Sequence, residues 1–366
     1  MKFQCETKKL YSALQLVASV IPSKSPREIL QNVLIDARND TIQLAGTDLE
    51  VAMRYVIPDV AVQEDGVILA DAAKLTQILR EAEGGTIVFD ATEPNEFTVS
   101  YEGSTYDLKS FDPEEYPDVP AFEGDHVEMD ASLLATMIEH TSFAAAKESM
   151  RFAINGVLFL VKDGNAQMVG TDGHRLAWIT RKVQISKDVA FKGIVPIKAL
   201  DVILRLVQDS EEPVKLKLEE NFILVKCGQG LVGSKLVEGN YPGYEDIIPK
   251  ENDRVVTADV AKLASAVRQA AILTGEESRA VRALFEKDRM IMTSRIPERG
   301  GAKIERAVEY SGPQTKIGFN PEYILDVLKV TTEETIRIEL KDKDKPALFK
   351  AGEGFLYVVM PVSIEE

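Results

Sequence analysis

The run Gly170–Trp178 (GTDGHRLAW) gathers residue types that can perform acid–base chemistry. Asp172 offers a carboxylate, His174 an imidazole and Arg175 a guanidinium. An imidazole oriented by a carboxylate can act as a general base, and a guanidinium can stabilise a developing anion. A hydrolase centred on Asp172, His174 and Arg175 is therefore one hypothesis for this sequence.

The rest of the sequence offers little to complete such a site. His126 and His140 are the other histidines, and neither forms an HxxxH or HExxH pattern with His174. The chain has no GxSxG motif and no glycine-rich phosphate loop. Cys5 and Cys227 lie far apart without a CxxC pairing, which argues against a zinc site or a disulfide scaffold. We therefore favour a structural or recognition role for the run, and we expect no metal and no cofactor.

Three segments of the chain repeat one pattern, and the run belongs to the second of them. Thr47, Thr171 and Thr293 each follow a short apolar strand, at separations of 124 and 122 residues. A common strand–turn is expected in all three copies, but only the middle one carries Gly-His-Arg. We expect the Thr and Asp side chains to bond local backbone. Gly173 should supply a conformation, or an approach, that a Cβ would block.

Helical periodicity repeats at a similar interval. Apolar residues recur at i, i+3 and i+4 spacing, as in Leu10, Leu14 and Val17. Asp, Pro or Asn opens the second helix of each copy, and these residues favour helix starts. The predicted helices cover residues 7–21, 71–83, 130–147, 196–209, 258–273 and 320–330, with alternating strands between them. The sequence thus predicts three α+β domains over residues 1–122, 127–249 and 253–366, each with two helices against an antiparallel sheet.

Composition indicates an ordinary globular protein. The 366 residues are 45% hydrophobic and 28% charged. No apolar run approaches the roughly 20 residues that span a bilayer, and the N-terminus lacks an apolar core of signal-peptide length. With only two cysteines, the chain is predicted to be cytoplasmic. The net charge of −16 by itself argues against nucleic acid, because phosphate binding favours a basic surface.

The whole chain resembles the bacterial sliding clamps, the β subunits of DNA polymerase III. The segments that carry the resemblance are Met1–Phe3, Gly46–Glu50, Thr171–Ala177, Ser234–Gly239, Gly318–Leu328 and Tyr357–Pro361. The family implies the DNA clamp fold, in which two chains join head to tail as a homodimeric ring. Such a ring surrounds double-stranded DNA without sequence preference, tethers a polymerase and has no catalytic activity.

The resemblance also implies partners. They are the α subunit of DNA polymerase III, the δ subunit of the clamp loader, and other proteins with a clamp-binding motif, such as repair polymerases, mismatch repair proteins and ligase. No cofactor and no membrane contact is expected.

Helix dimensions agree with a ring of two chains. Helices pack about 9 Å apart, so six in a circle give a diameter near 17 Å, which is too small for a duplex roughly 20 Å wide. Twelve helices give a diameter of about 34 Å and, after allowing about 10 Å for the helices themselves, a hole of about 24 Å.

The charge is not spread evenly along the chain. Over the predicted helices it sums to zero, so the strands, loops and tails carry the whole −16. A positive lining inside an acidic exterior would admit DNA only to the hole. The predicted DNA-binding residues are Lys24, Arg27, Lys74, Arg80, Lys147, Arg151, Lys198 and Arg205. Lys24 and Arg151 match loop positions that contact DNA in the family.

In the family, the turn that contains His174 borders a groove where partners insert a short peptide. The matching residues here are Ile154, Thr171, Gly173, His174, Arg175, Leu176, Pro242, Ile247, Asn320, Tyr323, Val358, Met360, Pro361 and Val362. The apolar members would form the pocket, in which Met adapts to varied ligands, while His174 and Arg175 would orient the turn or the peptide. Two features depart from the family: the tail ends in Ser363-Ile364-Glu365-Glu366, and Asp246 stands where relatives can carry a basic residue.

Overall fold

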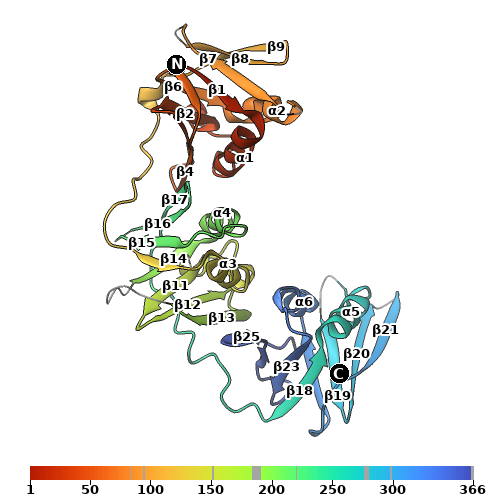
Figure 1. Ribbon diagram of the computed structural model, residues 1–366. Coiled ribbons are helices and arrows are strands. Elements are labelled where there is room, and N and C mark those ends of the chain that lie inside the picture. The colour runs from red at the N-terminus through yellow and green to blue at the C-terminus, as the bar shows by residue number, and fades with distance from the viewer. Residues whose placement is uncertain are drawn as a thin grey trace. The chain divides into compact units, whose positions relative to one another are not determined.

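The computed structural model describes residues 1–82, 84–93, 95–150, 152–183, 191–219, 221–275, 280–296 and 299–363 (Figure 1). Within them, helices and strands recur in three similar runs. The first run comprises β1 (Lys2–Glu6), α1 (Thr7–Ala18), β2 (Asn32–Arg38), β3 (Thr41–Thr47), β4 (Val51–Ile57), β5 (Ala61–Glu64), β6 (Gly66–Asp71), α2 (Ala72–Glu81), β7 (Thr86–Asp90), β8 (Glu96–Tyr101) and β9 (Ser104–Lys109).

The later runs follow the same order, except that no strand among the described residues corresponds to β5. The second comprises β10 (Val127–Met129), α3 (Ala131–Glu139), β11 (Gly156–Lys162), β12 (Asn165–Thr171), β13 (Arg175–Lys182), β14 (Phe191–Pro196), α4 (Ile197–Val207), β15 (Val214–Leu218), β16 (Phe222–Cys227) and β17 (Gly230–Lys235). The third comprises β18 (Arg254–Asp259), α5 (Val260–Ala271), β19 (Val281–Glu286), β20 (Arg289–Ile296), β21 (Gly300–Ala307), β22 (Thr315–Phe319), α6 (Pro321–Val330), β23 (Thr335–Leu340), β24 (Ala347–Lys350) and β25 (Phe355–Val359). The predicted α+β organisation is confirmed.

Two long sheets join consecutive runs. One has the order β10-β15-β16-β17-β4-β3-β2-β6, and the other β14-β11-β12-β13-β25-β24-β23-β18. All of their pairings are antiparallel. The chain accordingly forms two compact units that divide the second run between them. The first unit holds Met1–Ala135 and Lys198–Leu236, and the second holds Thr136–Val183, residues 191–197 and residues 237–363.

Helix starts and buried faces follow the sequence pattern. Asp71 Oδ1 accepts a hydrogen bond from Lys74 N at 2.9 Å, and Asn320 Oδ1 accepts one from Glu322 N at 3.0 Å. Each cap satisfies a backbone N–H that the helix itself leaves unpaired. On α1, the predicted apolar stripe of Leu10, Leu14 and Val17 is buried against the sheet.

One predicted helix is much too long. Residues 130–147 were expected to be helical, but α3 ends at Glu139. The Thr141 hydroxyl donates to Met137 O at 2.7 Å, and Thr141 N donates to Ile138 O at 3.1 Å, which tightens the last turn. A 3₁₀ turn, Ser142–Ala144, follows. Lys147 therefore lies outside the helix on which it was expected.

The helices carry more positive charge than predicted. Over their observed bounds they contain nine basic and five acidic residues, a net charge of +4 instead of zero. The predicted ranges had included flanking acids such as Asp71, Asp130 and Asp259, which lie just before the first turn. The rest of the chain consequently carries −20.

None of the helices within the described ranges combines the length and the apolar character needed to cross a membrane.

Candidate functional site

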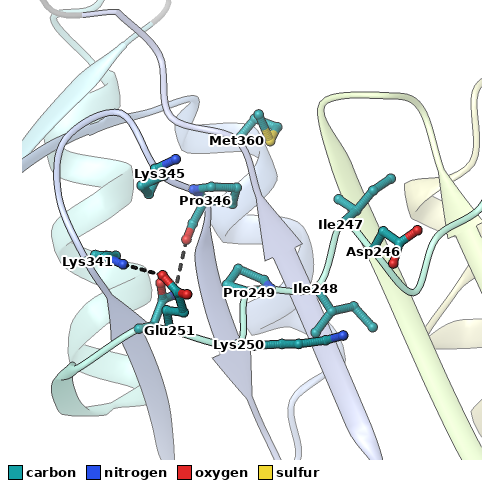
Figure 2. Close-up of a pocket in the computed structure, with 11 residues that line it drawn as sticks. Asp246, Ile247, Ile248, Pro249, Lys250, Glu251, Lys341, Lys345, Pro346 and Met360 are labelled. Carbon is teal, nitrogen blue, oxygen red and sulfur yellow. Dashed lines mark hydrogen bonds and ion pairs between the residues drawn. The ribbon is translucent and has the colours of Figure 1, made fainter.

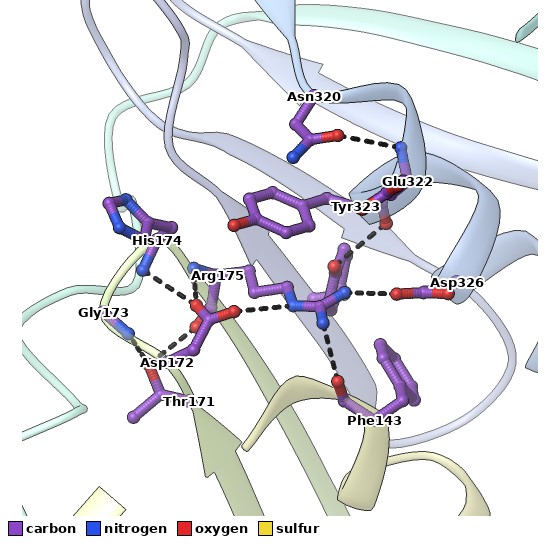
Figure 3. A network of polar contacts seen from close by, with 11 residues as sticks. Phe143, Thr171, Asp172, Gly173, His174, Arg175, Asn320, Glu322, Tyr323 and Asp326 are labelled. Carbon is purple, nitrogen blue, oxygen red and sulfur yellow. Dashed lines mark hydrogen bonds and ion pairs between the residues drawn. The ribbon is translucent and has the colours of Figure 1, made fainter. Parts of the chain in front are cut away.

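The Thr171–Arg175 turn is held by its own side chains. Thr171 Oγ1 donates to Arg175 O at 2.6 Å and accepts from Gly173 N at 3.1 Å. Asp172 Oδ1 accepts from His174 N at 2.9 Å and from Arg175 N at 3.0 Å (Figure 3). The predicted structural role of Thr171 and Asp172 is confirmed. Gly173 has φ of 89°, and a Cβ added there would meet nothing within 4 Å, so this position needs its conformation and not a close approach.

In the third copy, Thr293 and Ser294 do not form this turn, contrary to the prediction. Strand β20 continues through Thr293 and Ser294, and Thr293 pairs with Lys303 of β21. Ser294 Oγ instead donates to Ala270 O at 2.6 Å. A serine at this position has no carboxylate with which to accept the two backbone N–H groups that close the turn in the second copy.

Arg175 connects the turn to α6 and to the segment before β11. Its Nε donates to Asp172 Oδ2 at 3.0 Å, its Nη1 pairs with Asp326, and its Nη2 donates to Phe143 O at 2.7 Å. The guanidinium carbon lies 4.4 Å from the centre of the Tyr323 ring (Figure 3). These partners come from different parts of the second unit, so Arg175 fixes their relative positions.

The charge of Arg175 is well compensated. Burial alone would lower its pKa, but Tyr357, Asp326 and Asp172 outweigh that effect and raise the pKa above its ordinary value. Only 11% of the side chain is exposed. Because two carboxylates already balance its charge, this guanidinium is suited to positioning the turn and not to binding a further anion.

His174 has neighbours unlike those of a general base. Its N–H is bonded to Asp172, and its carbonyl accepts from Met360 N at 2.9 Å. The imidazole is exposed and has no hydrogen-bond or ion-pair partner among the residues that the structure describes. Both oxygens of Asp172 are used elsewhere, so the carboxylate does not orient the ring. Over the same residues, no cluster of His, Cys, Asp and Glu could hold a metal ion.

Some apolar residues of the predicted groove are buried, and others are exposed. Leu176 pairs with Val358 across β13 and β25, and each is 1% exposed within a buried cluster that includes Leu158 and Tyr244. Ile247 and Met360, by contrast, are 40% and 39% exposed. Ile247 and Met360 are therefore available for contact with a ligand, whereas Leu176 and Val358 belong to the core.

The other predicted groove residues also lie in the second unit. Ile154 is buried in the 3₁₀ turn Phe152–Ile154, and Asn320 and Tyr323 lie at the start of α6. Pro242 is exposed, while Pro361 and Val362 are half-buried. Val362 N donates to Gly318 O at 2.9 Å, which ties the tail to β22. Residues 364–366, with both terminal glutamates, lie outside the described residues.

A pocket of about 450 Å³ adjoins these exposed residues (Figure 2). Ile247 and Met360 line it together with Asp246, Ile248, Pro249, Lys250, Glu251, Asn252, Lys341, Lys345 and Pro346. Sequence reasoning missed the three lysines because nothing in their local pattern distinguishes them from other surface bases. It also missed Asp326, although the i+3 spacing from Tyr323 places both on one helix face.

The described residues of the predicted DNA-binding set are exposed, and they belong to both units. Lys24, Arg27, Lys74, Arg80, Lys198 and Arg205 lie in the first unit, Lys147 lies in the second, and Arg151 lies outside the described residues. Lys198 forms an ion pair with Asp48, and Arg80 lies 3.3 Å from Glu81. These two pairs reduce the positive charge that the sequence assigned to the set.

Comparison with known families accounts for almost the whole chain. Residues 1–120 match the model of the DNA polymerase III beta subunit N-terminal domain, residues 128–243 that of the central domain, and residues 245–363 that of the C-terminal domain.

Individual relatives are similar over their full lengths. The beta sliding clamps of Pseudomonas aeruginosa and Escherichia coli are 33% and 30% identical, each with 100% of both chains covered. Among solved structures, the Pseudomonas aeruginosa sliding clamp bound to griselimycin superposes with a TM-score of 0.95 at 32% identity, again with 100% of both chains covered.

Proposed function

The chain belongs to the DNA polymerase III beta subunit family, and from that premise we propose that two copies join head to tail as a ring around double-stranded DNA. It is a beta sliding clamp, a non-catalytic processivity factor of DNA polymerase III, with DNA and a polymerase as partners. The hydrolase hypothesis is therefore wrong.

One observation carries the ring proposal: the helices together carry a net positive charge in an otherwise acidic chain. The helices hold a net +4 while the remainder holds −20. A ring lined by helices would repel DNA outside and tolerate it inside. Contacts to phosphates carry no sequence information, which suits a clamp that must move along any duplex.

Solution mass tests the assembly. A single chain weighs 40.4 kDa, and six helices enclose too little space for a duplex, so the free protein should have about twice that mass. Light scattering at micromolar concentration measures it. A particle of one chain at that concentration would contradict the proposed ring.

We propose that the exposed bases Lys24, Arg27, Lys74, Lys147 and Arg205, with Arg80, Lys198 and Arg151, line the hole. The double variant Lys24→Glu/Arg151→Glu should weaken DNA contact and loading while the mass stays that of the wild type. Direct DNA affinity should fall as salt rises. A sequence-specific, salt-insensitive affinity would refute this assignment.

We also propose that the surface around Ile247 and Met360 receives short peptides from the polymerase α subunit, the loader δ subunit and other clamp-binding proteins. The support is geometric: two exposed apolar side chains line a pocket, and Met360 N bonds to the turn that Arg175 connects to its neighbours. Griselimycin, which the Pseudomonas aeruginosa clamp binds, should bind here as well and compete with such peptides.

A further inference from the structure

Lysines form part of the wall of the pocket beside Ile247 and Met360. Lys250, Lys341 and Lys345 line it, against the carboxylates of Asp246 and Glu251 (Figure 2). The pocket is thus net positive by one charge in a chain of net charge −16. A positive pocket in a negative chain favours negatively charged ligands, because complementary charges determine which ligands bind.

The lysines are not equally available. Lys341 Nζ lies 2.6 Å from Glu251 Oε2, so these two charges satisfy each other. Lys250 and Lys345 are exposed, and no carboxylate of the described residues lies within ion-pair distance of either. Opposite them, only Asp246 remains. Two uncommitted cations therefore face one uncommitted anion in the pocket.

In the loop that contains Lys345, basic and acidic residues alternate, and only basic ones line the pocket. It reads Lys341-Asp342-Lys343-Asp344-Lys345, and only its first and last residues line the pocket. Asp342 Oδ1 accepts from Asp344 N at 2.9 Å, so this carboxylate closes the loop's own turn. Because of this alternation, Lys341 and Lys345 line the pocket, while Asp342 and Asp344 do not.

We propose that this pocket receives the carboxylates of peptides that dock on Ile247 and Met360, so that ligands with Asp or Glu next to their apolar anchors are preferred. The proposal rests on the peptide groove and specifies the chemistry of its occupant. The apolar walls Ile248, Pro249 and Pro346 would contact the aliphatic part of such a side chain, and Lys250 and Lys345 would pair with its charge.

A peptide selection tests the preference. The probe is a synthetic peptide library with two fixed adjacent apolar residues and random residues on both sides, panned against the full-length protein. Wild type should enrich Asp and Glu at the flanking positions. The variant Lys250→Gln/Lys345→Gln should lose that enrichment while it still captures the apolar pair. The matched control is Lys343→Gln, which removes a charge from the same loop outside the pocket and should behave as wild type.

Selected peptides then give a magnitude. Replacing the flanking Glu with Gln should weaken binding to wild type by about 2- to 5-fold per exposed pair, and the difference should shrink at high salt. In the double lysine variant, the Glu and Gln peptides should bind equally.

The outcomes separate the pocket from the groove. If wild type captures no peptide, the groove proposal fails, and the pocket proposal with it. If peptides bind and griselimycin displaces them, but the flanks are neutral or basic, only the pocket proposal is overturned. An acidic preference that survives in the double lysine variant overturns it equally.

Discussion

The first two copies contain the same turn, and its backbone is held in the same way. Thr47 Oγ1 donates to Val51 O at 3.0 Å, as Thr171 does to Arg175 O at 2.6 Å. Asp48 Oδ1 accepts from the N–H groups two and three residues ahead, at 2.9 and 2.7 Å, as Asp172 does in its own turn. The left-handed position holds Leu49, with φ of 78°, in the first copy.

The side chains make the two turns different. The position of Arg175 is taken in the first copy by Val51, which is 1% exposed and belongs to the core. The second carboxylate oxygen of Asp48 therefore pairs with Lys198 instead of an arginine of its own turn. The same backbone turn thus packs an apolar side chain into the core in the first copy. In the second copy it makes a polar contact with α6.

The residue that donates a backbone hydrogen bond to each turn differs as well. Glu50 O accepts from Lys235 N at 2.9 Å, and His174 O accepts from Met360 N at the same distance. Both acceptors belong to equivalent turns, but one neighbour is an exposed lysine and the other an exposed methionine. Two copies of one backbone turn thus present different surfaces because a few side chains differ at equivalent positions.

The largest expected effect comes from exchanging these two neighbours. Met360→Lys should weaken peptide or griselimycin binding by about 2 kcal/mol or more, because an exposed apolar anchor is replaced by a charge. The reciprocal Lys235→Met should leave peptide binding unchanged. Fluorescence anisotropy measures both. Equal affinity of Met360→Lys and wild type would mean that the surface at Met360 is not the binding site.

Removing the polar junction should destabilise the second unit. Arg175→Met leaves Asp172 and Asp326 without their shared cation, and the free energy of unfolding should fall by about 2 kcal/mol. The double variant Arg175→Met/Asp326→Leu should recover part of this loss, since one orphaned carboxylate is gone. Urea unfolding measures the series. A single variant as stable as wild type would show that the junction adds nothing.

The left-handed position offers a smaller contrast. Gly173→Ala should cost about 1 kcal/mol through backbone conformation alone, because the added Cβ would meet no neighbour. Leu49→Gly should change stability by only about 0.5 kcal/mol, since relieved strain offsets the added flexibility of the unfolded chain. Thermal unfolding of both variants decides. A loss of several kcal/mol in Gly173→Ala would point to a clash and reject this explanation.

The smallest expected effect is the acid dependence of the turn in the first copy. Burial tends to raise the pKa of Asp48, but hydrogen bonds from Lys198, Val51 and Glu50 hold it below its ordinary value. The stabilisation is therefore complete above the unfolded-state pKa, near 4, and is lost as pH falls through the lower folded-state pKa. Lys198→Met should flatten this acid dependence by less than about 1 kcal/mol, as urea unfolding between pH 5 and pH 2 would show. The same slope in variant and wild type would contradict the role of Lys198.

Local sequence predicted the parts of this molecule that local interactions decide. Apolar spacing located the stripe of Leu10, Leu14 and Val17, and the Thr171-Asp172 pair indicated a self-bonded turn. The end of α3 escaped because Thr141 bonds back to the preceding turn, an alternative that apolar periodicity does not register.

Long-range pairing was beyond such patterns. Arg175 and Asp326 are 151 residues apart, and strand β4 pairs with β17 from the next run. Neither partner can be identified from residues near it in sequence, because strand order and cross-run contacts depend on the folded topology. The lysines of the pocket escaped for the same reason.

Retention on DNA tests the central claim, that the protein holds DNA by enclosing it. Purified protein is loaded onto a nicked circle, unbound protein is removed by gel filtration, and half of the sample is then linearised. Enclosure predicts that the protein stays with the circle and slides off the linear ends, because contacts to phosphates alone are weak and exchange rapidly at physiological salt. Equal retention on the circular and linear DNA would contradict it.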